Sequence, residues 1–320
     1  MTYPPFKAHR SLKNSHLQTI LANVYRPRAQ LQLTYETIDI AHDQLELVWL
    51  KQHLSGKSSP QPTLLLIHGL EGSVHSAYIQ AMMNQAKHHH DHFNVVTLHF
   101  RGCDGRVNQR AEGYHAGRSD DIAFAIHHLK QRGIGPIYAA GFSLGANALL
   151  KYLGENPTNP LQGAAAVSTP FDLAMACQQL EHPSNRLYQS RFLHGLKRTI
   201  QKKLDHGIAL TISNQRLQQL TSIRQIDEEV TAPIHGFHSA AHYYQSCSSQ
   251  QFISAIQTPT LIIHAKDDPM IPLSCIPKQF PTACQTEIYD HGGHVGFLSG
   301  RYLPQRWLEK RLLHWFWQLT

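Results

Sequence analysis

Short apolar runs bounded by turn residues recur along the chain. Three of them are uninterrupted, at residues 63–67, 94–100 and 260–264. Continuous hydrophobicity over this length is typical of strands that are covered on both faces, as parallel sheets require. Two alanine-rich runs, Ile137 to Ala140 and Gly163 to Ser168, fit the same role more loosely. The pattern predicts that these runs are strands of one buried sheet.

Amphipathic stretches lie between several of these runs. Residues 119–131 begin with a serine that suits a helix N-cap and two aspartates that suit the positive end of the helix dipole. A second helix is expected after Ser143, until Gly154 and Pro157 stop it. A third closes the chain, with apolar residues spaced by four, three and four between 308 and 319. Strands that alternate with helices predict an α/β fold with a mostly parallel sheet and right-handed crossovers.

Two intervals depart from this alternation of strands and helices. Residues 31–50 alternate apolar and polar positions, which indicates an antiparallel hairpin. Residues 174–254 lack strand-like runs and are polar, glutamine-rich and helical in character, which suits a cap over a binding site. We therefore expect a single α/β domain, residues 1–320, with a helical cap inserted between its sixth and seventh strands.

Composition and charge narrow the class of protein. Hydrophobic residues make up 42% of the chain and charged residues 16%, as in an ordinary globular protein. The N-terminus has no apolar signal-peptide region and no apolar stretch reaches about 18 residues, so a cytoplasmic location is expected. The formal charge of +7 is scattered among acids without a basic block. We therefore expect no nucleic-acid partner and at most peripheral contact with a membrane.

Cysteine and histidine raise the question of a metal. The five cysteines are irregularly spaced without a C-x-x-C pair, which favours reduced thiols over a disulfide framework or a zinc ribbon. Among the 24 histidines, the run from Lys87 to His92 could chelate a metal ion. It lies just before a predicted strand and has no second ligand cluster, so a solvated loop is favoured and no metal site is expected.

The sequence Gly141-Phe142-Ser143-Leu144-Gly145 is a G-x-S-x-G motif between a predicted strand and a predicted helix. A strand that turns sharply into a helix brings backbones close together and leaves no room for side chains at the two glycines. The turn holds the serine hydroxyl above the sheet, where the amide of Leu144 can donate to a developing oxyanion. The motif by itself also fits an ordinary tight turn. In this context Ser143 is predicted to be a catalytic nucleophile.

A second motif, His68-Gly69-Leu70, follows the buried run at 63–67. In folds with such a serine turn this position supplies the other oxyanion donor, and the amide of Leu70 is our candidate. His68 precedes Ser143 in the chain, whereas the expected order places the base last. We therefore interpret His68 as a residue that shapes the loop.

Two aspartates, Asp267 and Asp268, follow the run at 260–264. A carboxylate at the end of this strand can accept the imidazole Nδ1 proton of a base and fix its tautomer. Asp268 starts a D-x-x-x-P sequence, the usual register of the acid loop, and is favoured over Asp267, which would bind local backbone or water. Asp172 is a more remote alternative.

The sequence H-G-G-H-V-G at 291–296 follows the last predicted strand. Its glycines predict a close-fitting loop that lays the imidazole of His294 over Ser143, with His291 in a structural role. Ser143, Asp268 and His294 then follow the order nucleophile, acid, base of the α/β-hydrolase fold.

Further motifs span nearly the whole chain. Together with those above they comprise Asn14–Thr19, His68–Ser73, Phe100–Gly105, Gly141–Asn147, Asp227–Pro233, Gly236–Phe237, Tyr243–Tyr244, Asp267–Pro269 and Gly292–Phe297. They resemble the YheT-like branch of the α/β-hydrolases, related to eukaryotic abhydrolase-domain lipid hydrolases and to fungal medium-chain ester hydrolases and acyltransferases. The resemblance implies hydrolysis of carboxylic esters with short to medium or lipid-like acyl groups, no cofactor, and a triad of Ser143, Asp268 and His294.

These observations combine into one hypothesis, a serine hydrolase that forms an acyl-enzyme on a small-molecule ester or lipid. An acyltransferase or thioesterase with the same triad is the alternative, and a non-catalytic lipid-binding module is a third possibility that a lost triad member would indicate. Tyr243, Tyr244 and Phe237 could line an acyl pocket, although core packing explains these aromatics equally well.

Overall fold

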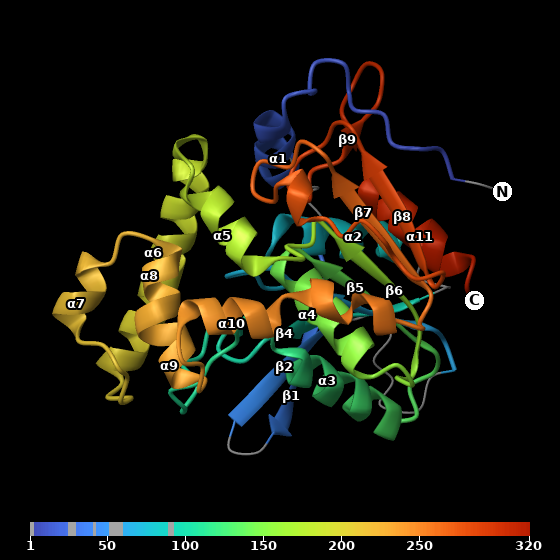
Figure 1. Cartoon of the computed structure of the whole chain (residues 1–320). Helices are drawn as coiled ribbons and strands as arrows, with labels where there is room; N and C mark the ends of the chain where they lie inside the picture. Colours follow the sequence, from blue (N-terminus) through green and yellow to red (C-terminus); the bar gives the residue numbers. More distant parts are fainter. Residues whose placement is uncertain (1–2, 25–29, 41–42, 51–59, 89–92) are drawn as a thin grey trace.

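Eight strands form one sheet at the centre of the molecule (Figure 1). The computed structural model describes residues 3–24, 30–40, 43–50, 60–88 and 93–320. The strands are β1 Leu33–Ile40, β2 Asp43–Leu50, β3 Thr63–Ile67, β4 Asn94–His99, β5 Ile137–Phe142, β6 Leu161–Val167, β7 Thr260–Ala265 and β8 Cys284–Tyr289. All five predicted strands are present, each within two residues of its expected bounds.

The sheet is mostly parallel, as predicted. Its order is β1-β2-β4-β3-β5-β6-β7-β8. Every pair from β4 to β8 in this order is parallel, whereas β2 is antiparallel to both β1 and β4. The predicted hairpin at 31–50 is thereby confirmed as β1 and β2. Because the carboxyl ends of parallel strands meet at one edge, the loops that follow β3, β5, β7 and β8 can meet there.

Side chains of the central strands enter two separate cores, because successive residues of a strand point to opposite faces. Leu65 and Ile67 of β3 belong to the core that includes α3 (Ser119–Gln131) and α4 (Leu144–Glu155). Leu64 and Leu66 belong to the core that includes α2 (Ala77–Lys87) and α11 (Leu308–Trp317). The continuous hydrophobicity of β3 therefore reflects burial on both faces.

The predicted helices lie where expected. Helix α3 has the predicted bounds, but its N-cap is Arg118 and the predicted cap residue, Ser119, is its first helical residue. Helix α4 begins directly after Ser143. The terminal helix α11 ends at Trp317, so Leu319 lies beyond it but still packs against the core of α2 and α11. The apolar spacing that predicted this helix thus extends two residues beyond the end of the helix.

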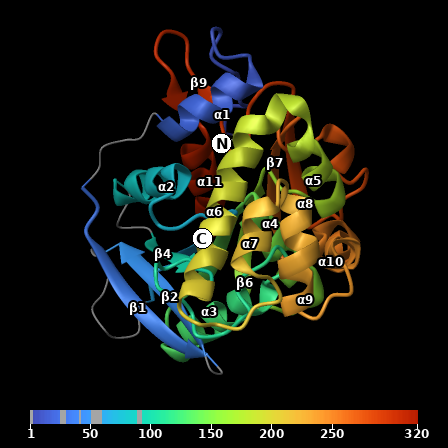
Figure 2. The same ribbon diagram turned by 90° about the vertical axis from the view of Figure 1, so that its left-hand side faces the viewer.

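The chain between β6 and β7 is helical, as predicted for the cap. Its segments are α5 Leu173–Glu181, η2 Pro183–Asn185, α6 Arg186–Asp205, α7 Asn214–Gln219, α8 Ile223–Ile226, the π-helical η3 Asp227–Thr231, α9 Ala232–Ile234, α10 Ala240–Cys247 and η4 Ser249–Ala255. Helices α6 to α9 gather on one side of the sheet (Figures 1 and 2). These helices form a small hydrophobic core of their own around Leu217, Leu220 and Ile226.

Some elements had no counterpart in the hydrophobic pattern. They include α1 Ser15–Val24, α2 Ala77–Lys87, η5 Leu273–Cys275, β8 Cys284–Tyr289 and the two-residue strands β9 Leu298–Ser299 and β10 Gln305–Arg306. Helix α1 is short, and residues 298–306 alternate too briefly to predict a strand pair.

Other expectations from the sequence concern membrane-spanning helices, disulfides and metal ligands. Among the described helices, none is long and apolar enough to cross a membrane. All five cysteines lie in the described part of the chain and are unpaired. His88 caps the end of α2, but the rest of the histidine run, 89–92, lies outside the described residues. In the described ranges no group of three or more His, Cys, Asp or Glu side chains could hold a metal ion.

Candidate active site

Ser143 occupies the turn between β5 and α4. Its backbone has a φ of +54° and a ψ of −123°, a conformation that a residue with a side chain adopts only under strain. The Ser143 amide donates to the carbonyl of Val167 at 2.9 Å, which ties the turn to the neighbouring strand β6. The tertiary structure therefore holds this strained serine in place.

Neighbouring backbone atoms leave no room for a side chain at the two glycines of the motif. A Cβ at Gly141 would lie 2.7 Å from the Cα of Ala146, and a Cβ at Gly145 would lie 2.3 Å from the carbonyl oxygen of His68. Neither contact can be relieved by moving a flexible side chain. The close approach expected from the sequence is thus present at both positions.

His294 lies between Ser143 and Asp268. Its Nε2 is 2.8 Å from the Ser143 hydroxyl, and its Nδ1 is 2.9 Å from Oδ2 of Asp268. The three side chains come from the ends of β5, β7 and β8, so the sheet brings together residues 26 to 151 positions apart. They form one continuous hydrogen-bonded chain.

The surroundings of Asp268 keep it ionised. Burial by itself raises the pKa of this carboxyl, but the charge and hydrogen bond of His294 outweigh that effect and hold the pKa below its usual range. Oδ1 also accepts hydrogen bonds from the amides of Met270 and Ile271, at 2.8 and 3.1 Å. The carboxylate is therefore positioned to orient the imidazole and to stabilise its charged form.

The other acids and bases considered from the sequence lie elsewhere. Asp267 contacts His291, with Oδ2 3.4 Å from Nδ1, so these two residues pair with each other at the surface. Asp172 caps helix α5, where it accepts a hydrogen bond from the Met175 amide at 3.0 Å. Only Asp268 of the three aspartates is hydrogen-bonded to His294 in the described structure.

His68 is fully buried below the loop that follows β3. Burial lowers its pKa to about 3, so the ring is neutral. Its Nε2 accepts from the Phe100 amide at 3.4 Å, which leaves the proton on Nδ1 to donate to the Gly69 carbonyl at 2.8 Å. These contacts fit the role of shaping the loop.

Backbone amides beside Ser143 are available to a ligand. The amides on either side of Leu70 are engaged, Gly69 with the Tyr78 hydroxyl at 2.8 Å and Glu71 with the Tyr114 hydroxyl at 2.6 Å. Within the described part of the chain, the amides of Leu70 and Leu144 donate to no protein group. Leu144 is the first residue of α4, where amides have no partner within the helix. Both amides are thus free to bind an anion.

Comparison with known proteins identifies the family of this chain. The sequence model of the alpha/beta hydrolase fold matches residues 62–301. A protein of Escherichia coli strain K12 named "Putative esterase YheT" is 35% identical over 313 residues, which cover 96% of this chain and 91% of that protein. The chain belongs to the α/β-hydrolase family, in its YheT-like branch.

More distant relatives agree with this assignment. The monoacylglycerol lipase of Saccharomyces cerevisiae is 30% identical over 264 residues, covering 79% of this chain and 58% of that protein. The solved structure of Est1E from Butyrivibrio proteoclasticus aligns with a TM-score of 0.54 at 12% identity, over 89% of this chain and 98% of the other. That identity shows the fold alone, and the predicted α/β-hydrolase fold is confirmed.

In this α/β-hydrolase, Ser143 and His294 line a cavity of about 120 Å³. Leu70 and Leu144 line it as well, so both free amides adjoin it. Most of its wall is apolar and comes from the cap and the loops around it, including Leu173, Ala176, Leu180, Phe192, Leu196, Ile223, Met270 and Ile271. Ser143 therefore borders a cavity with a mostly apolar wall.

The tyrosines singled out from the sequence contribute to this wall, but Phe237 does not. Tyr243 and Tyr244 of α10 line the cavity. Phe237 instead packs against Tyr243 and His115, with ring centroids 5.3 and 5.6 Å away. The sequence could not separate these roles, because all three are aromatic residues of the cap.

Asp227 is a buried carboxylate in the same wall, and the sequence reasoning did not single it out. It accepts a hydrogen bond from the Tyr244 hydroxyl at 2.7 Å, and burial raises its pKa to about 6. It begins the π-helical turn η3, a type of irregularity that is frequent at functional sites. The only signal was its place in the Asp227–Pro233 motif.

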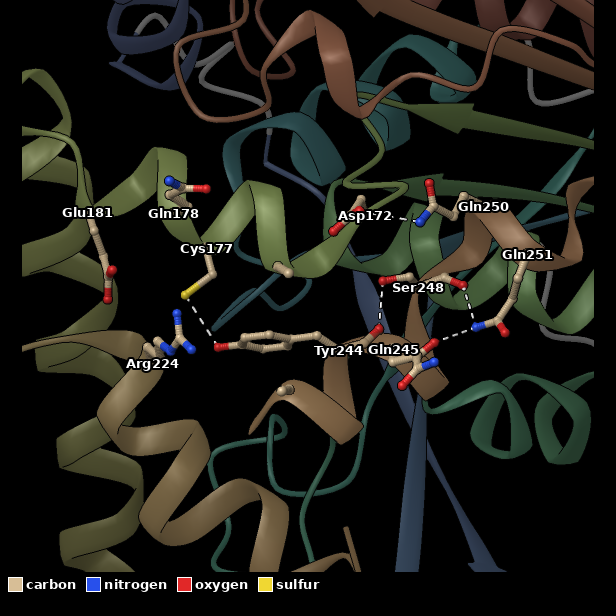
Figure 3. Close-up of a pocket in the computed structure, with 12 residues that line it drawn as sticks. Asp172, Cys177, Gln178, Glu181, Arg224, Tyr244, Gln245, Ser248, Gln250 and Gln251 are labelled. Atoms are coloured by element: carbon tan, nitrogen blue, oxygen red, sulfur yellow. Dashed lines mark hydrogen bonds between the residues drawn. The ribbon is translucent and has the colours of Figure 1, made fainter. Parts of the chain in front are cut away.

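Beyond Tyr244 lies a second, more polar pocket of about 370 Å³ (Figure 3). Cys177 and Tyr244 line both this pocket and the cavity at Ser143. The Tyr244 hydroxyl oxygen lies 3.3 Å from the Cys177 sulfur, and the figure shows this contact between the two side chains. The pair thus forms a wall shared by the two spaces.

Proposed function

We propose that the protein is a serine hydrolase of carboxylic esters that works through an acyl-enzyme on Ser143. One observation carries this proposal: the hydrogen-bonded chain Ser143–His294–Asp268 opens into an apolar cavity with two free backbone amides beside it. The relatives named as an esterase and as a monoacylglycerol lipase support the same chemistry.

In the first half-reaction, Nε2 of His294 takes the proton of Ser143 as the hydroxyl oxygen attacks the ester carbonyl. Asp268 fixes the tautomer, because Nδ1–H donates to its carboxylate, and stabilises the imidazolium that forms. The amides of Leu70 and Leu144 bind the negative charge that develops on the carbonyl oxygen. His294 then donates its proton to the departing alcohol.

In the second half-reaction, His294 deprotonates water, which attacks the acyl-enzyme and releases the acid. The apolar wall formed by the cap suits an acyl chain of short to medium length or a lipid-like group. The same intermediate can pass its acyl group to an alcohol or thiol, so the acceptor distinguishes hydrolysis from acyl transfer.

Replacement of the nucleophile tests the proposal. We expect Ser143→Ala to abolish labelling by a fluorophosphonate probe and to lower hydrolysis of p-nitrophenyl esters by about 10³-fold or more, because the acyl-enzyme can no longer form. Ser184→Ala, at an exposed serine of the cap, is the matched control and should leave both readouts unchanged.

The result that overturns the proposal is a Ser143→Ala protein that still labels and turns over like the wild type. With ethanol added, a product that is mainly free acid supports hydrolysis, whereas a product that is mainly ethyl ester shows that acyl transfer is the main reaction.

A further inference from the structure

Helix α1 packs directly against the loop that carries His294. The His294 amide donates to the Thr19 hydroxyl oxygen at 2.9 Å, and that hydroxyl donates to the Ser15 carbonyl at 2.8 Å. The Gln18 side chain holds the far end of the loop by two bonds, accepting from the Leu298 amide at 2.8 Å and donating to its carbonyl at 3.0 Å. Gln18 and Thr19 are 0% and 2% exposed.

Two glycines of the loop allow this close contact. A Cβ at Gly293 would lie 2.6 Å from the Thr19 amide nitrogen, and a Cβ at Gly296 would lie 2.7 Å from the Gln18 carbonyl oxygen. Neither glycine has a positive φ, so the backbone conformation alone does not call for glycine. The contact with α1 explains both.

The same helix also contacts the cap. The ring of His16 stacks on that of Tyr188 of α6, with centroids 5.7 Å apart and planes 4° from parallel. The Tyr188 hydroxyl lies 3.1 Å from Nδ1 of His16, which precedes Gln18 and Thr19 on α1. A short path of side chains therefore runs from the cap through α1 to His294, and Figure 1 shows α1 beside the β9 segment that follows this loop.

We propose that Gln18 and Thr19 are positioning residues for the catalytic base, and that α1 serves to fix the His294 loop over Ser143. This inference rests on the proposed function. The physical reason is that the imidazole sits on a glycine-rich loop whose backbone would otherwise move, and a displacement of about 1 Å at a reacting group can cost about 100-fold in rate. Thr19 and Gln18 fix this loop at its centre and at its end.

Removal of the Thr19 hydroxyl tests the inference. Thr19→Val keeps the shape of the side chain but leaves the buried His294 amide without an acceptor. We expect kcat for a p-nitrophenyl ester and the rate of fluorophosphonate labelling to fall about 10- to 100-fold, with KM within about threefold of the wild type. Thr19→Ser retains the hydroxyl and should restore kcat to near the wild-type value.

A second variant disturbs the contact between α1 and the His294 loop by a substitution in the loop. Gly296→Ala forces the loop away from α1 without altering the helix, and should produce the same fall in kcat with KM little changed. It keeps the inference testable should Thr19→Val fail to fold. Val24→Ala is the control on α1, since Val24 is 70% exposed, and should leave kcat unchanged.

The outcomes separate the inference from the function on which it rests. An inert wild-type protein, or a Ser143→Ala protein that labels normally, overturns the proposed function and the inference with it. An active wild type whose Thr19→Val and Gly296→Ala variants keep kcat within about twofold overturns the inference alone. So does a Thr19→Ser variant as slow as Thr19→Val.

Discussion

Two buried carboxylates show how the surroundings of a single residue decide its charge. Asp268 has an imidazole and two backbone amides as partners, and its pKa is lowered despite burial. For Asp227, burial raises the pKa to about 6, because its hydrogen-bonding partners, Tyr244 and Thr231, are neutral hydroxyls. The hydrogen-bonding and charged partners of each carboxyl, rather than its burial alone, therefore decide the direction of its pKa shift.

Asp227 also makes stability depend on pH. Its pKa in the folded protein lies above the ordinary value of 3.8, so the ionised form is disfavoured by folding and stability falls as the pH rises from about 4 to about 6. We expect Asp227→Asn to raise the free energy of unfolding at pH 8 by on the order of 3 kcal/mol, since the amide oxygen can still accept from Tyr244.

The measurement is the unfolding midpoint in urea at pH 4 and at pH 8. Below about pH 4 the wild-type carboxyl is protonated in both the folded and the unfolded protein, so most of the gain should be absent at pH 4. An equal gain at both pH values, or a loss at pH 8, contradicts this account of Asp227.

At the scale of elements, the site forms where the ends of parallel strands meet. Ile67 of β3 pairs with Gly141 of β5, so the loop after β3 and the turn after β5 lie side by side. That adjacency explains why Gly145 contacts the His68 carbonyl and why Leu70 and Leu144 border one cavity. The turn at Ser143 and the loop at Leu70 are therefore one packed unit.

A methyl group at Gly145 should break this unit. Its Cβ would lie 2.3 Å from the His68 carbonyl oxygen and 2.6 Å from that of Ile67, so α4 and the end of β3 must separate. We expect Gly145→Ala to lower the free energy of unfolding by about 1–3 kcal/mol and to reduce kcat at least about 10-fold.

The matched control is Gly113→Ala, where the nearest atom to the new Cβ would be the Lys203 nitrogen at 3.7 Å. Thermal unfolding and ester hydrolysis of the two variants give the comparison. A Gly145→Ala protein as stable and active as Gly113→Ala would show that the close approach has no consequence.

At the scale of the whole molecule, loops at the ends of the sheet's strands supply Ser143, Asp268 and His294, and the cap supplies most of the apolar wall. Leu173, Phe192, Leu196 and Ile223 of the cap line the cavity together with Ser143. Leu196 belongs to α6, the helix whose Tyr188 contacts α1. The cap thus borders the cavity at Ser143 and also touches helix α1, which contacts the His294 loop.

The cap should therefore set the preferred acyl chain length. Leu196→Trp places a larger side chain in the cavity, and we expect kcat/KM to fall about 10-fold for long-chain p-nitrophenyl esters while acetate hydrolysis changes less than about threefold. Leu187→Trp, on the same helix but at a residue that is 79% exposed, should leave the whole chain-length profile unchanged. A profile that is unaltered in Leu196→Trp places the acyl group elsewhere.

Much of the fold could be predicted because its information is local. Continuous apolar runs mark strands buried on both faces, and the periodicity of 119–131 marks the helix α3 with its bounds. The G-x-S-x-G motif lies within five consecutive residues, so the turn could be predicted as well. The chain order of serine, aspartate and histidine added the candidate triad, whose catalytic role stays a prediction.

Other features depend on contacts between segments far apart in the sequence. The packing of the sheet, the cap and the loops around them brought Asp268, which the sequence favoured, against His294, placed Tyr244 but not Phe237 in the cavity wall, and buried Asp227 beside it. It also seated Thr19 against a loop 275 residues away. The sequence by itself determined the elements and the nucleophile turn, because these follow from local sterics and burial. Only the tertiary structure decided which side chains meet, because a contact depends on the packing of the whole sheet and cap.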